Sequence, residues 1–468
     1  MQLQKRAHAI VIGGSIAGLC AARALSSHFA RVSLIERDQL PSGAAHRRGV
    51  PQSHHVHALL LRGLAELESL FPGIERELSA AGAKRMDMGS EIAHCTEWGW
   101  APRARVDVAP LTMSRLLIES VVRARIRREL PNLELREGTR VLGLTTERSG
   151  ERVLVTGAVT SQGELGAELV VDASGRHSKC LDWLAAAGVE PPAEELVDAF
   201  AGYASRFYEL APDPARWWRG MVIDAKAPLL RRWALLMPVE HGRSVLTLAG
   251  VNREYPPSDE PGFHAYLESL LSPELAREIA RAKPLSDIHT HHALSNRARH
   301  FERWRRKVGG FVSLGDSAIA FNASHGQGMS MAAVSANALD AVLASTAHGD
   351  PYELTRRFHE RQWKLLRTAW LLATGADLEW PETQGKRRWD HRWKMAVGVS
   401  IVRAAHEDPA IKRMIGPVFQ LLAEPHSLLR PSFIARVIFA ELRRRLGRSL
   451  TLLDRHEFER LPAESTRS

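Results

Sequence analysis

The segment that decides the fold reads HAIVIGGSIAG over residues 8–18 and RVSLIE over residues 31–36. Residues 8–12 are short, apolar and followed by glycines, which is typical of a buried parallel strand. Residues 19–27 are rich in Ala and Leu and predict a helix. Residues 31–36 predict a second strand that ends in an acid, Glu36. This is the layout of a dinucleotide-binding βαβ unit.

The residue types in this unit suit a pyrophosphate. Gly13 permits the tight turn, the backbone of Gly14 and Ser15 can approach the phosphates, and Gly18 lets the helix pack on the strand. The helix N-terminus adds unpaired N–H groups and partial positive charge. Glu36 can accept both hydroxyls of an adenosine ribose. Ser15 replaces the second glycine of the usual fingerprint but is small. The alternative, an ordinary glycine-rich turn, leaves Glu36 unexplained.

Length and composition set the class of protein. The chain has 468 residues, 45% of them hydrophobic and 25% charged, which favours two or three globular domains and excludes a disordered, collagen-like or coiled-coil chain. No apolar run approaches the roughly 18 residues that span a bilayer, so no transmembrane segment is expected. The N-terminus lacks a signal-peptide layout, which predicts a cytoplasmic protein. Three widely spaced cysteines argue against a disulfide framework or a zinc cluster.

The net charge of +10 raises the question of an anionic partner. The basic residues are dispersed in small groups and no nucleic-acid motif accompanies them, so we expect no nucleic-acid partner. A basic amphipathic stretch at residues 433–446 could lie on a membrane surface, but such helices more often pack on their own domain, and we expect the latter.

Coarse patterning predicts a mixed α/β fold with a Rossmann-like domain, an inserted sheet and a helical C-terminal region. Residues 111–128 predict a helix, and residues 133–144, 152–160 and 166–171 predict strands. Residues 195–295 carry short strands and turn signals. We expect a discontinuous cofactor domain from 1–85, 103–180 and 296–345. A sheet-rich substrate domain from 86–102 and 181–295 and a helical region from 346–468 complete the division.

Three further segments carry polar chemistry. The loop Arg47-Arg48-Gly49-Val50-Pro51-Gln52 offers two arginines to phosphate; the alternative is a solvent-exposed basic loop. His54, His55 and His57 follow it, but no carboxylate or cysteine stands at ligand spacing, so no metal is expected. Residues 172–178 form a polar turn after a predicted strand. Gly315-Asp316, followed by Gly326–Met329 and a small-residue helix, makes a second helix N-terminus suited to anions.

Taken together in this order and spacing, these features resemble the group A FAD-dependent monooxygenases, which are built like para-hydroxybenzoate hydroxylase. The runs at residues 46–52 and 315–322 look like the polyether epoxidase branch of that family, which contains the monensin and lasalocid enzymes. The resemblance covers roughly residues 8–345.

The resemblance implies FAD as cofactor and assigns roles by position. Arg47, Arg48 and Arg115 would contact the phosphates and ribityl chain, and Asp316 would hold the ribityl hydroxyls. Val50 would lie by the isoalloxazine, Val141 by the adenine, and the N–H groups of residues 326–329 by the flavin pyrimidine edge. The full implied set is Gly13, Gly14, Ser15, Gly18, Glu36, Arg37, Arg47, Arg48, Val50, Arg115, Val141, Asp316, Gly326, Gly328 and Met329.

The sequence departs from the family pattern at three places. Ala323 replaces the usual proline, His325 stands where the epoxidase branch often has an aromatic residue, and Ser174-Gly175 replaces an Asp-Gly pair. The last change leaves two electron sources open, direct reduction by NAD(P)H and a separate flavin reductase as partner.

The implied chemistry is that of a flavin C4a-hydroperoxide, formed with O2 as co-substrate, which epoxidises or hydroxylates a lipophilic polyketide, terpenoid or aromatic molecule in secondary metabolism. The rivals are a flavin halogenase, an alkene reductase of the geranylgeranyl type and a non-catalytic FAD-binding protein. No catalytic base is readable. Pocket candidates are His325, His291 and Trp100, with His289 and His291 sharing a face if residues 289–291 form a strand. The alternative for that strand is a plain surface, and the alternative for Trp100 is core packing. We expect a monomer or dimer.

Overall fold

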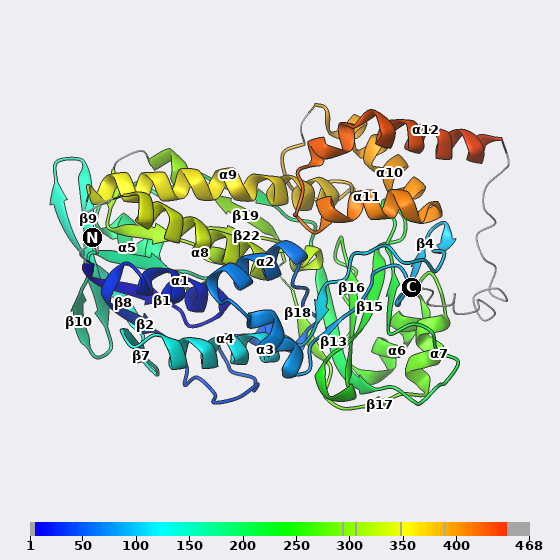
Figure 1. Cartoon of the computed structure of the whole chain (residues 1–468), viewed down its shortest axis with the longest axis horizontal. Helices are drawn as coiled ribbons and strands as arrows, with labels where there is room; N and C mark the ends of the chain where they lie inside the picture. Colours follow the sequence, from blue (N-terminus) through cyan, green and yellow to red (C-terminus); the bar gives the residue numbers. More distant parts are fainter. Residues whose placement is uncertain (1–4, 293, 305–306, 347–348, 388, 447–468) are drawn as a thin grey trace.

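The computed structural model describes residues 5–292, 294–304, 307–346, 349–387 and 389–446. One half of the molecule, at the left of Figure 1, is built on a five-stranded parallel sheet. In spatial order the strands are β21 (Phe311–Ser313), β11 (Leu169–Asp172), β1 (Arg6–Ile12), β2 (Phe29–Ile35) and β7 (Leu133–Arg136). The predicted βαβ unit is confirmed, since β1 pairs in parallel with β2 and α1 (Ile16–Ser26) joins them.

Both faces of this sheet are covered, which explains why β1 is apolar at every position from 9 to 12. Ala9 and Val11 belong to a core formed with α1 and other helices, whereas Ile10 and Ile12 pack toward a second sheet. The helices on the first side are α1, α2 (Leu61–Leu70), α3 (Ile74–Ala80), α4 (Arg115–Glu129) and α8 (Gly328–Ser345).

Two predicted segments differ from the structure in their boundaries. The helix expected over 111–128 begins only at Arg115, because Ser114 caps it and residues 111–112 form β6 (Leu111–Thr112) with β3 (Lys84–Arg85). The strand expected over 133–144 is two strands, β7 and β8 (Val141–Ser149), which join different sheets. A positive φ at Gly138, between them, turns the chain.

The second sheet is antiparallel apart from one short parallel edge. Its members are β8, β9 (Arg152–Thr160), β10 (Gly163–Gly166) and β20 (Val308–Gly309). A small sheet of β12 (Glu194–Val197), β19 (Asn296–Arg299) and β22 (Ile319–Ala320), together with α5 (Cys180–Ala186), completes this half.

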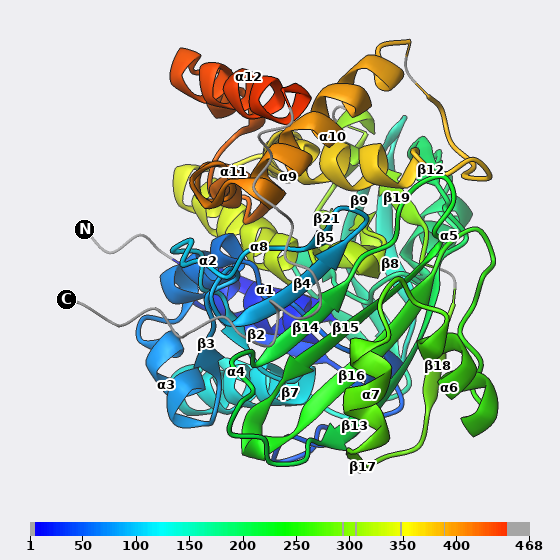
Figure 2. The same cartoon turned by 90° about the vertical axis from the view of Figure 1, so that its right-hand side faces the viewer.

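A large eight-stranded sheet forms the other half of the molecule (Figures 1 and 2). Its order is β17 (Lys283–Pro284), β13 (Gly202–Glu209), β16 (Ser244–Gly250), β15 (Arg232–Pro238), β14 (Gly220–Ile223), β4 (Ile92–Thr96) and β5 (Gly99–Trp100), with β18 (His289–His291) on β13. The helices α6 (Glu260–Glu268) and α7 (Glu274–Ala280) pack on one face. Residues 92–100 thus join a sheet built otherwise from residues after 201; the domain boundaries themselves stay a prediction.

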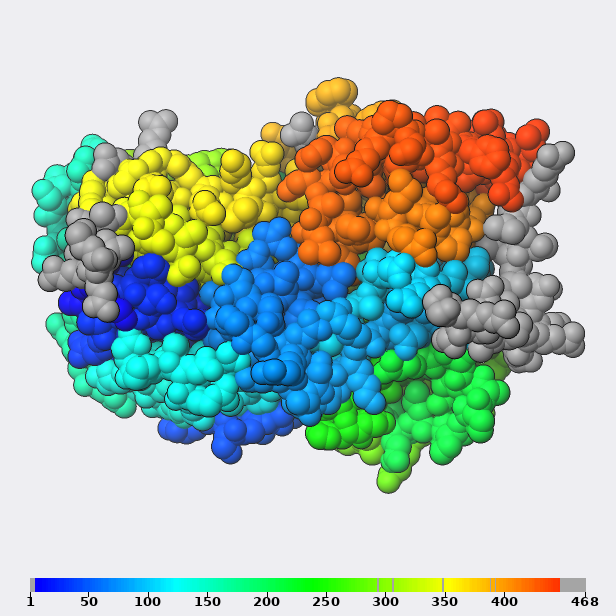
Figure 3. Space-filling model, in the orientation of Figure 1, coloured from blue at the N-terminus to red at the C-terminus, as the bar shows by residue number. Residues whose placement is uncertain are grey.

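The C-terminal helices are α9 (Pro351–Asp377), α10 (His391–Glu407), α11 (Pro409–Phe419) and α12 (Pro431–Arg445). The long α9 lies along α8 and contributes Phe358 and Trp370 to the two cores of the parallel sheet. The helix α12 lies on the outside of the molecule (Figure 3). Its Phe433 is buried against α10 and α11, whereas its Phe439 is 61% exposed. Within the described residues, no helix is both long and apolar enough to cross a membrane.

Candidate functional site

The turn after β1 requires glycine at two positions, Gly13 and Gly18. Gly13 has φ +103°, and a Cβ there would lie 2.5 Å from the carbonyl oxygen of Ala173. A Cβ on Gly18 would overlap the carbonyl oxygen of Gly13. Because α1 therefore starts directly against the strand end, its first N–H groups face the turn, and the Ser15 side chain does not cap them.

Glu36 lies at the carboxyl end of β2, where a ribose acceptor was predicted, and it is buried. Its carboxylate accepts the N–H of Gly14 at 2.8 Å and the N–H of Asp38 at 3.0 Å. Glu36 therefore also fixes the shape of the first turn, a role that its spacing alone did not indicate.

Arg47 reaches the same turn, but protein carboxylates surround its guanidinium. It pairs with Glu36 at 3.2 Å, Asp38 at 3.0 Å and Glu119 at 3.0 Å, and it donates to the carbonyl of Gly14 at 3.2 Å. Burial opposes its charge, yet Glu119 and Glu36 raise the pKa of Arg47 above its ordinary value. Arg47 thus supports the predicted phosphate site by bracing the turn. Sequence reasoning missed Glu119, which lies on α4.

The other residues predicted for the cofactor site differ in how close they lie to the first turn. Arg115 donates to Ser15 Oγ at 2.7 Å and so sits at the start of α1. Val50 is buried, and Val141 is half-buried on β8. Arg48 and Arg37 are exposed. Only Arg115 of these five contacts the first turn through a hydrogen bond in the described part of the chain.

The second turn brings Asp316 to the same place from β21. Gly315 has φ +67°, and a Cβ there would lie 2.9 Å from that of Ala17 in α1, so the two turns touch. The Asp316 carboxylate makes no hydrogen bond or ion pair with any described residue. Burial raises its pKa, while the nearby Arg176 and Arg115 oppose that rise.

The loop to α8 follows Asp316. Gly326 has φ +63°, and Gly328 begins α8 beside the Asp316 carboxylate: Asp316 Oδ1 lies 3.7 Å from where a Cβ of Gly328 would be. Met329 is buried in the first turn of this helix.

Buried polar atoms that make no hydrogen bond test whether FAD fits here. Arg115 Nε, Ser324 Oγ and Gln327 Oε1 are buried, and no hydrogen bond satisfies them within the described residues. Together with Asp316 they supply donors and acceptors at both turns. Buried polar groups of this kind need partners, and phosphate oxygens and ribityl hydroxyls are of the complementary type. The residues present therefore fit FAD.

The polar side chains of the turn at residues 172–178 hydrogen-bond to one another. Asp172 accepts hydrogen bonds from the hydroxyls of Ser174 at 2.6 Å and Ser178 at 2.7 Å. Its carboxylate is buried and committed to the turn, and the side chain at 174 is a neutral hydroxyl.

His325 stands on the loop before α8 and belongs to a buried network. Its Nε2 lies 2.8 Å from Asp377 Oδ1, and the other oxygen of Asp377 accepts from Asn296 at 2.7 Å and Asn322 at 2.9 Å. Because Asp377 only accepts, His325 carries its proton on Nε2 and presents Nδ1. Asp377 lies 52 residues further along, at the end of α9, and no sequence signal connected the two.

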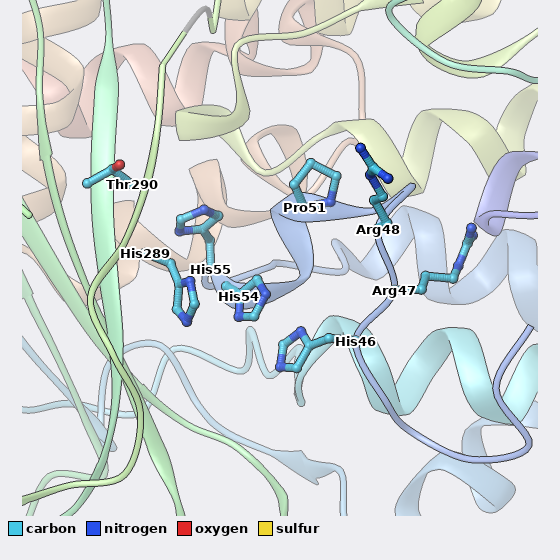
Figure 4. Close-up of a pocket in the computed structure, with 8 residues that line it drawn as sticks. All are labelled: His46, Arg47, Arg48, Pro51, His54, His55, His289 and Thr290. Carbon is cyan, nitrogen blue, oxygen red and sulfur yellow. The ribbon is translucent and has the colours of Figure 1, made fainter. Parts of the chain in front are cut away.

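A pocket of about 450 Å³ opens beside the arginine loop (Figure 4). It is lined by His46, Arg47, Arg48, Pro51, His54, His55, His289 and Thr290. The rings of His46, His54 and His289 form a stack with successive centroids 3.7 Å apart. These residues come from a loop, a 3-10 turn (Pro51–His54) and β18.

An inner group of rings lies behind this stack. His55 Nδ1 shares a hydrogen bond with Ser205 Oγ at 2.9 Å. The His55 and Tyr203 rings meet edge to face, with their centroids 4.3 Å apart. His291 lies 5.6 Å from Tyr203 between ring centroids. His289 and His291 therefore share a face of β18. His289 and Thr290 line the pocket, whereas His291 is not among its lining residues and contacts Tyr203 behind it.

Trp100 lies elsewhere. It is 7% exposed and packs in the core of the eight-stranded sheet with Ala93 and Met221. Its aromatic ring fills the sheet core, and it does not line the pocket described above. Across the described residues, no group of three or more His, Cys, Asp or Glu side chains is arranged to hold a metal ion.

Comparison with known proteins agrees with this geometry. The FAD binding domain family matches residues 6–362. Protein Rv3254 from Mycobacterium tuberculosis (strain ATCC 25618 / H37Rv) is 30% identical over 456 residues, which cover 93% of this chain and 94% of that protein.

Three solved structures share the fold at low identity. The flavin-dependent brominase Bmp2 has a TM-score of 0.64 at 16% identity, covering 94% of this chain and 100% of that one. A flavoprotein/dehydrogenase from Cytophaga hutchinsonii has 0.65 at 15%, with coverages of 94% and 100%. PqsL, a probable FAD-dependent monooxygenase from Pseudomonas aeruginosa, has 0.57 at 18%, with coverages of 80% and 97%.

These likenesses show the fold, and the epoxidase branch stays a prediction. The match over residues 6–362 spans both turns, the arginine loop and Asp316. The chain belongs to the FAD binding domain family, a family of FAD-dependent oxidoreductases.

Proposed function

We propose that the chain is an FAD-dependent monooxygenase that inserts one oxygen atom of O2 into a small molecule by epoxidation or hydroxylation. The observation that carries the proposal is the position of the pocket. It opens between the arginine loop of the cofactor half and β18 of the eight-stranded sheet. A substrate held there would lie beside the place that Val50 marks for the flavin ring.

The chain's own residues would bind and position the cofactor. Asp316 and Arg115 would hold the ribityl chain and phosphates, and the N-terminus of α8 would favour negative charge on the flavin pyrimidine. When bound and reduced by NAD(P)H or a flavin reductase, FAD would supply the oxygen chemistry, with one atom of O2 going to the substrate and the other to water.

Other residues would exclude water. Tyr203 joins an apolar cluster with Val251 and Leu294, against which Trp233 and Trp380 pack. Such a wall keeps the reacting region dry and suits an apolar substrate body. His325 is not among the residues that line the pocket, and its contact with Asp377 fixes the loop before α8.

Flavin halogenation is the second candidate, because the fold of Bmp2 covers 94% of this chain. Alkene reduction uses no oxygen and is the third. The three reactions leave different atoms in the product: one oxygen, one halogen or two hydrogens.

The test uses purified, FAD-loaded protein with NADPH, or with NADH and a general flavin reductase, under isotopically labelled O2. Bromide is present, and the substrates are a panel of aromatic and alkenyl compounds. We expect products that carry one labelled oxygen atom. Brominated products would establish halogenation, and saturated products without label would establish reduction.

A further inference from the structure

The helix α12 packs on the rest of the molecule through its inner side. Phe433 is buried among residues of α10 and α11, and Val437 and Ala440 pack beside it. These three positions recur every three or four residues, so they form one stripe along the helix. The packing expected for residues 433–446 therefore involves the inner side of α12.

The outer side of α12 carries a second apolar stripe. Ile434, Ile438 and Leu442 follow one another at intervals of four residues, and Leu446 continues the row just after the helix. Phe439 lies beside this row. The exposed fractions of these five side chains range from 42% to 73%, and Figure 1 places α12 at the outer edge of the molecule. A contiguous apolar row of this kind on a protein surface usually marks a contact site.

Arginines border the outer stripe. Residues 430–446 contain five arginines and one acid, Glu441. Arg436 precedes Phe439 by three residues and Arg443 follows it by four, so both arginines lie on the same side of the helix as that ring. The guanidinium carbon of Arg443 lies 6.0 Å from the centre of the Phe439 ring. The exposed apolar row and a strong positive charge therefore occur together on this helix.

The charge and the size of this face favour an anionic lipid surface over a second copy of the chain. Two such faces would bring arginine against arginine. A helix of 15 residues is about 22 Å long and roughly 10 Å wide, so its outer face covers roughly 200 Å². A stable protein interface buries about 800 Å² on each partner. A bilayer accepts a single protruding helix, because the apolar side chains enter the headgroup region while the arginines pair with lipid phosphates.

We propose that the outer face of α12 binds the surface of a membrane that contains anionic lipid, with the helix lying in the plane of that surface. Ile438, Phe439 and Leu442 would enter the headgroup region, and Arg443 would pair with lipid phosphate. α12 has 15 residues, fewer than the roughly 20 that span a bilayer, so the contact is peripheral. The proposal is independent of the reaction that the cofactor half supports.

Binding is measured by co-sedimentation of the full-length, FAD-loaded protein with sucrose-loaded vesicles. One set of vesicles is pure phosphatidylcholine, and the other is a mixture of phosphatidylcholine and phosphatidylglycerol. The double variant Ile438→Gln/Leu442→Gln removes apolar area, and Arg443→Gln removes a charge. Arg443 is preferred to Arg436 for this test because Arg436 also pairs with Asp408 at 2.8 Å.

Two matched control variants lie outside the C-terminal helices. Leu285→Gln removes an apolar side chain that is 40% exposed, just after β17. Arg303→Gln removes the charge of a side chain that is 63% exposed, in the 3-10 turn Phe301–Trp304. Both controls should bind the vesicles as the wild-type chain does.

We expect the wild-type chain to bind the anionic vesicles at least about tenfold more tightly than the neutral ones, and high salt should release it. The double variant should lose about tenfold in affinity, and Arg443→Gln about three- to fivefold. FAD content and Tm should stay at wild-type values in every variant, because the substituted side chains are exposed.

Three results would overturn the proposal. They are no sedimentation with anionic vesicles, equal binding to anionic and neutral vesicles, and wild-type binding in both α12 variants. Analytical ultracentrifugation without lipid tests the rival occupant. A wild-type dimer that the double variant cannot form, in a chain that binds no vesicles, would assign the outer face of α12 to a second copy of the chain.

Discussion

The cofactor half and the pocket half of this molecule are built by different means. In the cofactor half, glycines at positive φ and acids at strand ends fix the backbone within short stretches of chain, as at Gly13 and Gly315. In the pocket half, side chains from a loop (residue 46), a 3-10 turn (residue 54) and a strand (residue 289) meet although they are far apart in the chain. The backbone turns of the cofactor half tolerate few substitutions, and they can be predicted from the sequence. The side-chain contacts of the pocket half are set by packing and can vary while the fold stays the same.

The largest effect is expected at Gly18, where the cofactor half leaves no room. A Cβ there would overlap the carbonyl oxygen of Gly13. Gly18→Ala should cost about 3 kcal/mol of stability by overpacking and should abolish FAD retention. Flavin content and the free energy of unfolding check this. Gly375→Ala is the control, since Gly375 lies in α9 with open space around its Cβ and should gain up to about 1 kcal/mol. A Gly18→Ala protein that retains the wild-type FAD content would contradict the claim that the cofactor half tolerates few substitutions.

Acid should weaken the pocket half. Burial, with repulsion from His57 and His291, lowers the pKa of His55 to about 2 from 6.5. The unfolded chain therefore binds a proton that the folded chain refuses, so stability falls as the pH drops below 6.5. By pH 4 the loss due to His55 is on the order of 3 kcal/mol. Urea unfolding at pH 4, 5 and 6.5 should show a smaller acid loss in His55→Gln, which can keep the bond to Ser205. An equal loss in both proteins would argue against this origin.

Removing the unpaired acid of the cofactor half should weaken FAD binding by a moderate amount. Asp316→Asn replaces charge-assisted hydrogen bonds with neutral ones, which predicts about a 10- to 100-fold rise in the FAD Kd. Isothermal titration of the deflavinated protein measures it. Asp340→Asn is the control, because Asp340 is a half-exposed acid on α8 that bonds only His28 among the described residues. Equal affinity in the two variants would contradict the role of Asp316.

The smallest effect is expected at Arg37. The resemblance placed it among the cofactor residues, but the structure leaves it exposed, with no hydrogen bond or ion pair to another described residue. Arg37→Gln should change the FAD Kd by less than about twofold, as for most exposed side chains. A tenfold loss in the same titration would support the cofactor role that the resemblance assigned to Arg37.

Much of the fold was predictable because its determinants are local. The strand at residues 8–12 and the helix after it follow from spacing and glycine chemistry, and the structure confirms both. Glu36 directly follows the second strand, and its ribose contact stays a prediction. The predicted helix and strand boundaries were wrong where a helix cap or a turn interrupts the pattern, as at Ser114 and Gly138.

The candidate site divides in the same way. The two turns were predictable, since each lies directly after an apolar strand. Arg47 was expected at phosphate, yet its carboxylate partners include Glu119, which is distant in sequence. The Asp377 partner of His325 and the stacked histidines arise from contacts between segments far apart in the chain. Residue patterns along a single sequence do not encode such contacts.

The most direct test of the whole account follows the reaction of reduced flavin with O2. The purified protein is reduced without oxygen, mixed with oxygenated buffer and followed by stopped-flow absorbance, with and without an aromatic compound. We predict a transient spectrum that differs from those of both reduced and oxidised flavin and lasts longer with the ligand bound. Reoxidation in a single step under every condition, or a protein that retains no FAD, would contradict the account.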